Sequence, residues 1–348
     1  MDATTVAIDL AKNDFELAIA GPDGRLIEHR RLARGAFSRF FVNRPPCHIV
    51  MEACGSAHHW GRVFTALGHT VRLLPAQYVK AYVRRNKTDR ADASALLEAQ
   101  RSQDIQAVPI KTEAQQTILQ LHRVRSQWMR TRTARINSLR GCLREFGMAI
   151  PVGARSGLTR VREHLALADS AIPPALRPIV HDLLGEIAEL DARMQTCERQ
   201  LTALTREDPV ITQLLQIPGI GPLTATAMRA AVVDVHRFRT ARHLASWIGL
   251  TAREHSSGNS RHLGRIDKRG DVYLRTLLIH GARAVLLAAR NALARGRSLD
   301  RLRQWALDVQ ARRGHNKAAV ALANKLARIA WVTWKHQREF NGNWALAR

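Results

Sequence analysis

Strand-forming patterns occur only in the first third of this 348-residue chain, and this limits the possible folds more than any other feature. Short apolar runs of strand length, separated by turn-forming residues, lie at 4–11, 15–20, 25–32, 48–53 and 69–74. Residues 57–68 have the periodicity of a helix instead. Antiparallel strands followed by alternating strands and helices predict an α/β domain with a mixed sheet.

From about residue 112 the strand patterns give way to helical ones. Residues 118–147 form one long helical pattern, and residues 177–206 form a second whose apolar side chains have coiled-coil-like spacing. Such a stripe suits packing within the chain as well as a dimer seam, and both alternatives stay open. The stretch between them, which contains Pro151, Gly153 and Gly157, is expected to be a connection.

The C-terminal part is also helical in pattern, with loops expected at 217–222 and 251–271. The whole chain is therefore expected to consist of an α/β domain, a basic helical or coiled-coil linker and an all-α domain, at residues 1–108, 109–206 and 207–348.

The charge of the chain points to a polyanionic partner. Lys and Arg number 54 against 29 Asp and Glu, which gives a formal charge of +25. A positive potential of that size attracts nucleic acid. An anionic membrane is the competing partner, but proteins of that kind usually carry one basic amphipathic helix rather than charge throughout. On the long helix, Arg123, Arg130 and Arg135 are the residues expected to follow a nucleic-acid backbone, because few acids accompany them in that stretch.

Secretion and membrane insertion are not expected. The four cysteines are scattered without the spacing of a zinc site, and the opening residues lack the basic region and long apolar core of a signal peptide. The most apolar later segment, 272–289, is interrupted by Arg275, His280 and Arg283. These features predict a cytoplasmic, DNA-associated protein that does not enter a membrane.

Four carboxylates are candidates for a metal site. Asp9 lies among apolar residues of the first strand, where burying a lone carboxylate is costly unless it is paired or metal-bound, and Glu52 ends the fourth strand. Asp89 and Asp92 lie three positions apart at a helix start, where they would repel each other. Helix capping explains this pair by itself, but the four together favour a site for Mg²⁺, or Mn²⁺.

Three groups of residues are candidates for nucleic-acid contact. Arg84, Arg85 and Lys87 flank the acidic pair. Gly219 and Gly221, in "IPGIG", resemble the turn of a helix–hairpin–helix, whose backbone N–H groups bind phosphate, although a simple packing corner is the alternative. The third group surrounds a serine-rich loop and comprises Arg261, Arg265, Lys268 and Arg269.

That loop is the candidate for nucleophilic chemistry. Ser256, Ser257 and Ser260 lie in a Gly-containing stretch among basic side chains, which could stabilise a reacting phosphate and carry away a proton. Serine is also common in loops without any catalytic role, so the residues alone leave both interpretations open.

Over nearly its whole length the chain resembles the DEDD-type insertion-sequence transposases, the IS one-ten group with its eleven-eleven branch, which includes the Piv-type invertases. The matching stretches are "AIDLAK" (7–12), "MEACGSAHHW" (51–60), "NKTDRADA" (86–93), "IPGIG" (217–221), "GLTAREHSSG" (249–258) and "GRIDKRGDVYLRTLLIHGARAVL" (264–286). The chain departs from the branch at Asn259-Ser260, where Gly-Lys is frequent, and at Asp267, where Ser or Thr is usual.

The resemblance implies a RuvC-like, ribonuclease-H-type N-terminal domain in which Asp9, Glu52, Asp89 and Asp92 bind Mg²⁺, with Ser257 as the nucleophile of the C-terminal domain. It implies strand exchange through a covalent 5′-phosphoserine link on double-stranded DNA of element ends and target. It also implies a structured bridge RNA, and homodimers that assemble into a tetramer. A hydrolytic Holliday-junction nuclease and a non-catalytic nucleic-acid scaffold are the alternatives.

Overall fold

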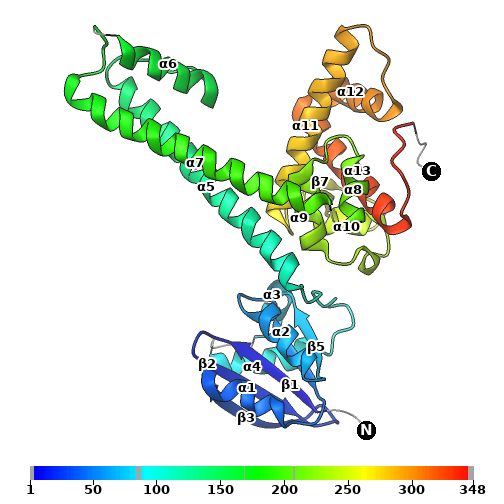
Figure 1. Cartoon of the computed structure of the whole chain (residues 1–348). Helices are drawn as coiled ribbons and strands as arrows, with labels where there is room; N and C mark the ends of the chain where they lie inside the picture. Colours follow the sequence, from blue (N-terminus) through cyan, green and yellow to red (C-terminus); the bar gives the residue numbers. More distant parts are fainter. Residues whose placement is uncertain (1–3, 84–87, 168, 207, 344–348) are drawn as a thin grey trace. The chain divides into compact units, whose positions relative to one another are not determined.

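The computed structural model describes residues 4–83, 88–167, 169–206 and 208–343 (Figure 1). The chain forms two compact units, Met1–Ala114 and Gln115–Arg348, which we describe in turn. The sequence predicts three domains, with boundaries after residues 108 and 206. These boundaries stay predictions.

A five-stranded mixed sheet forms the first unit together with its helices (Figure 1). The strands are β1 (Thr5–Leu10), β2 (Asp14–Ala20), β3 (Leu26–Ala33), β4 (His48–Glu52) and β5 (Thr70–Leu74). The helices are α1 (Arg34–Val42), α2 (Ala57–Ala66), α3 (Ala76–Val79), η1 (Lys80–Tyr82) and α4 (Asp89–Ala99). In the order β3-β2-β1-β4-β5, the first three strands are antiparallel, and β4 is parallel to both β1 and β5. The predicted α/β domain with a mixed sheet is confirmed.

The two faces of this sheet carry side chains of different size. Large residues such as Phe15 and Met51 pack on one face against α1 and α2. Small residues such as Ala7 and Ala18 lie on the other face against α4. Side chains alternate between faces along a strand, so the small residues let α4 pack closely on the sheet.

Helix α1 was absent from the sequence prediction. Its N-cap position is Ala33, which makes no side-chain capping hydrogen bond, so the usual start signal is missing. The helix is stabilised by burial of Phe37 and Phe41, and the Phe37 ring stacks on Phe15 with 3.9 Å between centroids.

In the described part of the second unit, the regular structure is helical apart from one small hairpin. Its long helices are α5 (Glu113–Arg144), α6 (Ala154–Ala166), α7 (Arg177–Ala203), α11 (Val272–Ala294), α12 (Arg301–Arg313) and α13 (His315–His336). The shorter elements are η2 (Pro174–Leu176), η3 (Leu204–Arg206), α8 (Pro209–Leu215), α9 (Pro222–Val232), η4 (Val235–Arg237), α10 (Ala241–Trp247), β6 (Ala252–Glu254) and β7 (Leu263–Ile266). Helices α9 to α13 share one apolar core, in which α13 is buried through residues such as Leu322 and Leu326.

Helices α5 and α7 lie antiparallel, side by side (Figure 1), and ion pairs join them. These pairs are Arg125–Glu198, Arg132–Asp191 and Arg135–Glu186. The expectation that the arginines of α5 lack opposing acids is therefore wrong, because the acids come from α7, some 50 to 70 positions later in the chain. Apolar residues of α7, such as Leu184 and Ile187, are buried against α5 and α6, so this stripe serves packing within the chain.

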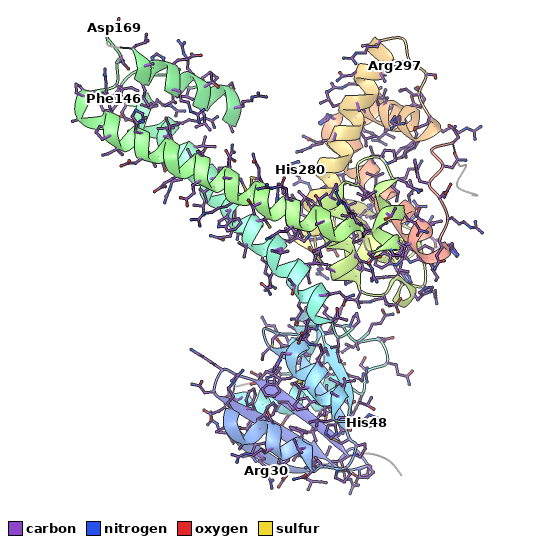
Figure 2. The ribbon with its side chains drawn as sticks, viewed as in Figure 1. Arg30, His48, Phe146, Asp169, His280 and Arg297 are labelled. Carbon is purple, nitrogen blue, oxygen red and sulfur yellow. The ribbon has the colours of Figure 1, made fainter. Side chains whose placement is uncertain are left out.

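The stretch between the two long helices contains α6 and is not merely a connection. Figure 2 labels Phe146 and Asp169, which flank this segment at one end of the α5–α7 pair. Gly157, interpreted from the sequence as a breaker, is buried, and a Cβ there would lie 3.0 Å from Ile150. The glycine allows close packing within a helix, and the sequence alone does not distinguish this role from that of a residue that ends a helix.

The C-terminal part contains β6 and β7, so the expected all-α domain and the expected loop at 251–271 need correction. These strands have three and four residues and are almost wholly exposed, so they lack the apolar alternation that identifies a strand. Among the described helices, α11 alone has the length and composition of a membrane span. Its Leu278, Ala282 and Leu286 are buried in the protein core, as expected for a core helix.

A buried histidine fixes α5 to two other helices of this unit. The imidazole of His122 has Nδ1 3.0 Å from the Tyr273 hydroxyl of α11 and Nε2 3.0 Å from the Thr226 hydroxyl of α9. Burial, and secondarily the positive charge of Arg125, lowers the pKa of His122 to about 4. The ring is therefore neutral in the folded protein at neutral pH.

This pKa predicts an acid-sensitive packing contact. The unfolded chain binds a proton at this position near pH 6.5 and the folded protein only near pH 4, so stability falls as the pH drops through that interval. His122→Gln should be less stable than wild type at pH 7. Between pH 6.5 and pH 4, however, its free energy of unfolding should fall less steeply than that of wild type, with a difference in slope of up to about 1.4 kcal/mol per pH unit. Urea unfolding followed by circular dichroism across this range measures both slopes; equal slopes would contradict the prediction.

Two glycines bring α11 against the turn between α8 and α9. Gly219 has a φ of +85°, and a Cβ at Gly281 would lie only 1.9 Å from the Gly219 carbonyl oxygen. No side chain fits there, so the backbones touch directly, and Ile217 and Ile220 are buried on either side of the turn.

Gly281→Ala should therefore destabilise the protein by about 3 kcal/mol or more, at the upper end of overpacking costs. Gly185→Ala is the matched control, because Gly185 lies in α7 with open space around its Cβ position. There the substitution should stabilise by about 0.5–1 kcal/mol through helix propensity. Thermal unfolding of both variants is the measurement, and a Gly281→Ala midpoint equal to wild type would refute the contact.

Candidate acidic site and serine hairpin

Three carboxylates lie in a row across the α4 face of the sheet. Asp9 is directly opposite Glu16 in the β1–β2 ladder. Ile8 pairs with Met51 in the parallel β1–β4 ladder, so Asp9 and Glu52 are the next residues along those strands. All three alternate in phase with the small residues under α4, and all are partly buried. Glu16 was missed in the sequence, although it carries the same signal as Asp9, a carboxylate in an apolar strand.

The other two predicted acids lie in the first turn of α4. The N-cap is Thr88, whose hydroxyl accepts a hydrogen bond from Ala91 N at 3.2 Å, so Asp89 is beside the cap and does not form it. Asp89 is exposed and pairs with Arg31 of β3, with 3.5 Å between Oδ2 and Nη2. Asp92 is partly buried one turn further on.

The structure brings these acids to one face without gathering them into a cage. Burial raises the pKa of the Cys54 thiol, and the charges of Glu52 and Asp9 raise it further, so each of these carboxylates lies near the thiol. Within the described residues, no three His, Cys, Asp or Glu side chains are close enough to hold a metal ion. The donor set, all carboxylate oxygen, has the chemistry that Mg²⁺ and Mn²⁺ prefer. The flanking Arg84, Arg85 and Lys87 lie outside the described residues.

The predicted nucleophile lies at the tip of the β6–β7 hairpin. Ser257 and Ser260 exchange backbone hydrogen bonds of 3.2 and 3.1 Å, and Gly258 follows Ser257 with a φ of +54°, as tight hairpin turns require. Ser257 is exposed, and its hydroxyl makes no hydrogen bond within the described part of the chain.

Both neighbouring serines are engaged. The Ser256 hydroxyl donates to Glu254 Oε1 at 2.8 Å, and Arg261 donates to the same oxygen at 3.0 Å. These two hydrogen bonds, the Ser256 one first, lower the pKa of Glu254. Ser260 Oγ is 3.0 Å from His262 Nε2. Because Ser257 and Ser260 are direct partners, the Ser260–His262 pair lies on the same side of the hairpin as Ser257.

The base of the hairpin is fixed to the helical core. Cβ atoms at Gly249 and Gly270 would lie 2.0 and 1.9 Å from backbone oxygens of Arg269 and Trp247, so only glycine fits at either position. The buried guanidinium of Arg275 donates to the Ile248 carbonyl at 2.8 Å. The exposed tip is thus carried on a rigid base.

The basic residues predicted to contact nucleic acid in this region differ in whether they are already paired with acids. Arg261 is paired with Glu254, and Arg269 lies 3.5 Å from Asp267. Lys268 has a positive φ of +60°, uncommon for a residue with a side chain, and Arg265 is exposed. Hairpin pairing brings Glu254 to Arg261, whereas Asp267 is only two residues from Arg269.

The remaining predicted contacts lie in the helices. Gly219 is committed to the packing against α11, and Gly221 is the exposed N-cap of α9, just before Pro222. On α5, Arg130 bonds Gln127 of its own helix and Arg135 is paired with Glu186.

Matches to known proteins give the chain a family. A family model described as "Transposase IS116/IS110/IS902 family" matches residues 211–297, and a model of the DEDD transposase domain of the IS110 group, described as a transposase, matches residues 6–148. A "Probable family 20 transposase" from Pseudomonas aeruginosa is 42% identical over 95% of this chain and 97% of its own length. The chain belongs to this transposase family.

Other relatives support the same family assignment. The transposase resembles the "Transposase for insertion sequence element IS1111A" from Coxiella burnetii, at 37% identity over 97% of this chain and 92% of that protein. It is 25% identical to the "Pilin gene-inverting protein" of Moraxella bovis over 98% of both chains. The predicted resemblance is confirmed, and the chain is an insertion-sequence transposase, an enzyme class that cuts and recombines DNA. Its DEDD-type domain implies use of a divalent metal ion.

The ion pairs of α5 indicate which of its arginines are available to contact DNA phosphates. Arg123 is exposed and, within the described chain, has no ion pair, whereas Arg132 is mostly buried against Asp191. If Arg123 and Arg130 contact phosphates, replacing both with Ala should reduce the salt slope of DNA binding by about two, at roughly one unit per contact.

Arg132→Ala is the control, since its charge is already compensated, and its slope should equal that of wild type. Fluorescence anisotropy of labelled duplex DNA over a range of salt concentrations gives the slopes. An unchanged slope in the double variant would remove α5 as a backbone track.

Proposed function

We propose that this transposase cuts and rejoins DNA with Ser257 as nucleophile and the carboxylates of the sheet and α4 as a divalent-metal site. The observation that carries the proposal is the state of the Ser257 hydroxyl, which is exposed and without a hydrogen bond among the described residues, while Ser256 and Ser260 are engaged. A hydroxyl at a rigidly based tip can meet a phosphodiester with little loss of freedom.

In the proposed reaction, Ser257 Oγ attacks the scissile phosphorus and forms a 5′-phosphoserine link. The bond to the 3′ oxygen breaks, and that oxygen leaves with a proton from water. The serine proton passes to the Ser260–His262 pair, which lies on the same side of the hairpin. Attack by a different 3′ hydroxyl reverses these steps and completes strand exchange. The charge on the phosphate is stabilised by exposed cations of the hairpin such as Arg265.

The acids Asp9, Glu52, Asp89 and Asp92 would hold Mg²⁺, or Mn²⁺, which supplies Lewis-acid stabilisation of the phosphate oxygens. Their common face and all-oxygen chemistry support this assignment. The strand order β3-β2-β1-β4-β5, with three antiparallel strands followed by two parallel ones, supports a RuvC-like, ribonuclease-H-type fold for the first unit. The exposed N-terminus of α9 at Gly221 supports phosphate binding by a helix–hairpin–helix-like turn.

The partners proposed are double-stranded DNA of the element ends and target, a structured bridge RNA, and further copies of the chain as a dimer that assembles into a tetramer. The net charge of +25 supports a large nucleic-acid surface. The RNA and the assembly rest on the family resemblance.

The test is covalent trapping on end-labelled DNA. Wild type with Mg²⁺ should give a protein–DNA adduct, and Ser257→Ala should give none. Ser256→Ala is the matched control, because the same change one residue away leaves the nucleophile and should leave the adduct. Asp89→Asn should lose it if the carboxylates bind the metal.

The outcomes separate the alternatives. An adduct with Ser257→Ala would exclude this nucleophile. Cleavage without an adduct in wild type would identify a hydrolytic nuclease. Binding without adduct or cleavage in every variant would identify a scaffold.

A further inference from the structure

A row of charged side chains crosses four strands on the α4 face of the sheet. Glu52, Asp9 and Glu16 continue into Arg31 of β3, which is directly opposite Glu16 in the β2–β3 ladder. Direct partners in an antiparallel ladder lie about 4.5–5.5 Å apart at Cβ, so the guanidinium of Arg31 can reach Glu16 as well as Asp89. Arg31 thus stands between two carboxylates, one on the sheet and one on α4.

The contact that Arg31 makes is with Asp89, at 3.5 Å. Both side chains are more than half exposed, at 64% and 60%, so the pair is weak and easily released. The pairing holds Asp89 toward β3, whereas Asp9 and Glu52 lie on the two strands beyond β2. While it is paired in this way, Asp89 is kept from the acids of β1 and β4.

We propose that Arg31 is a resident counter-charge that competes with the metal ion for Asp89. When a divalent cation binds, Asp89 leaves Arg31 and joins the other acids, and Arg31 turns to Glu16, its partner across the ladder. Glu16 is therefore a positioning residue, which stabilises the released form of Arg31. The inference rests on the metal site of the proposed function and adds two residues outside the four acids.

The test is Mn²⁺ affinity without DNA, measured on the full chain by electron paramagnetic resonance of the free ion. Arg31→Gln removes the competitor and should bind Mn²⁺ about five-fold more tightly, the factor that corresponds to a surface ion pair of about 1 kcal/mol. Arg30→Gln is the matched control. Arg30, labelled in Figure 2, is the adjacent residue, but it lies on the opposite face of the sheet and pairs with Glu28. The Arg30→Gln variant should therefore bind Mn²⁺ as tightly as wild type.

Glu16→Gln should weaken Mn²⁺ binding a few-fold, because the displaced Arg31 loses its second partner, while Glu28→Gln on the opposite face should not. Arg31→Lys keeps a charge at the position and should bind at or near the wild-type affinity, which guards against a folding defect in Arg31→Gln. Unchanged or weaker binding by a folded Arg31→Gln would overturn the proposal.

Failure of the metal site itself would look different. Wild type would then bind Mn²⁺ no better than Asp9→Asn, which would overturn the proposed metal role and this inference together. Asp9-dependent binding that is insensitive to Arg31 would overturn only the inference.

Discussion

Backbone-to-backbone contact at glycine is the constraint on which the helical unit depends. Gly281 lets α11 touch the α8–α9 turn, and the contacts of Gly249 and Gly270 hold the end of α10 against the stretch before α11 at the base of the serine hairpin. In each case a single Cβ would overlap a backbone oxygen. The position of Ser257 is therefore set by a chain of main-chain contacts, and the hairpin strands themselves contribute little because they are short and exposed.

Electrostatics organises the first unit in a different way. Carboxylates on neighbouring strands repel each other, and a folded sheet tolerates Asp9, Glu16 and Glu52 in one row only where charge or solvent compensates them. The counter-charge next to this row is Arg31, whose ion pair among the described residues is with Asp89 of α4. In our proposal, Asp89 gives up this pair before it can bind an ion.

Patterns within one element were predictable from the sequence, and contacts between distant elements were not. The five strands, α2, α4 and the two long helices follow from local apolar periodicity. Helix α1 and the serine hairpin lack that periodicity, because one depends on aromatic packing and the other on a turn. The acids opposite Arg125, Arg132 and Arg135 come from a helix about 60 residues away, so the basic stretch appeared unopposed.

The same distinction applies to the candidate site. The local sequence was enough to name Asp9, Glu52, Asp89 and Asp92. The charged side chains around them, however, are set by how the strands pair. Glu16 belongs with them because it is opposite Asp9, and Arg31 because it is opposite Glu16. A motif identifies which residues are candidates for the chemistry, whereas the ladder determines which charges those residues meet. In our proposal, Glu16 and Arg31 are residues of the second kind and control when the metal site forms.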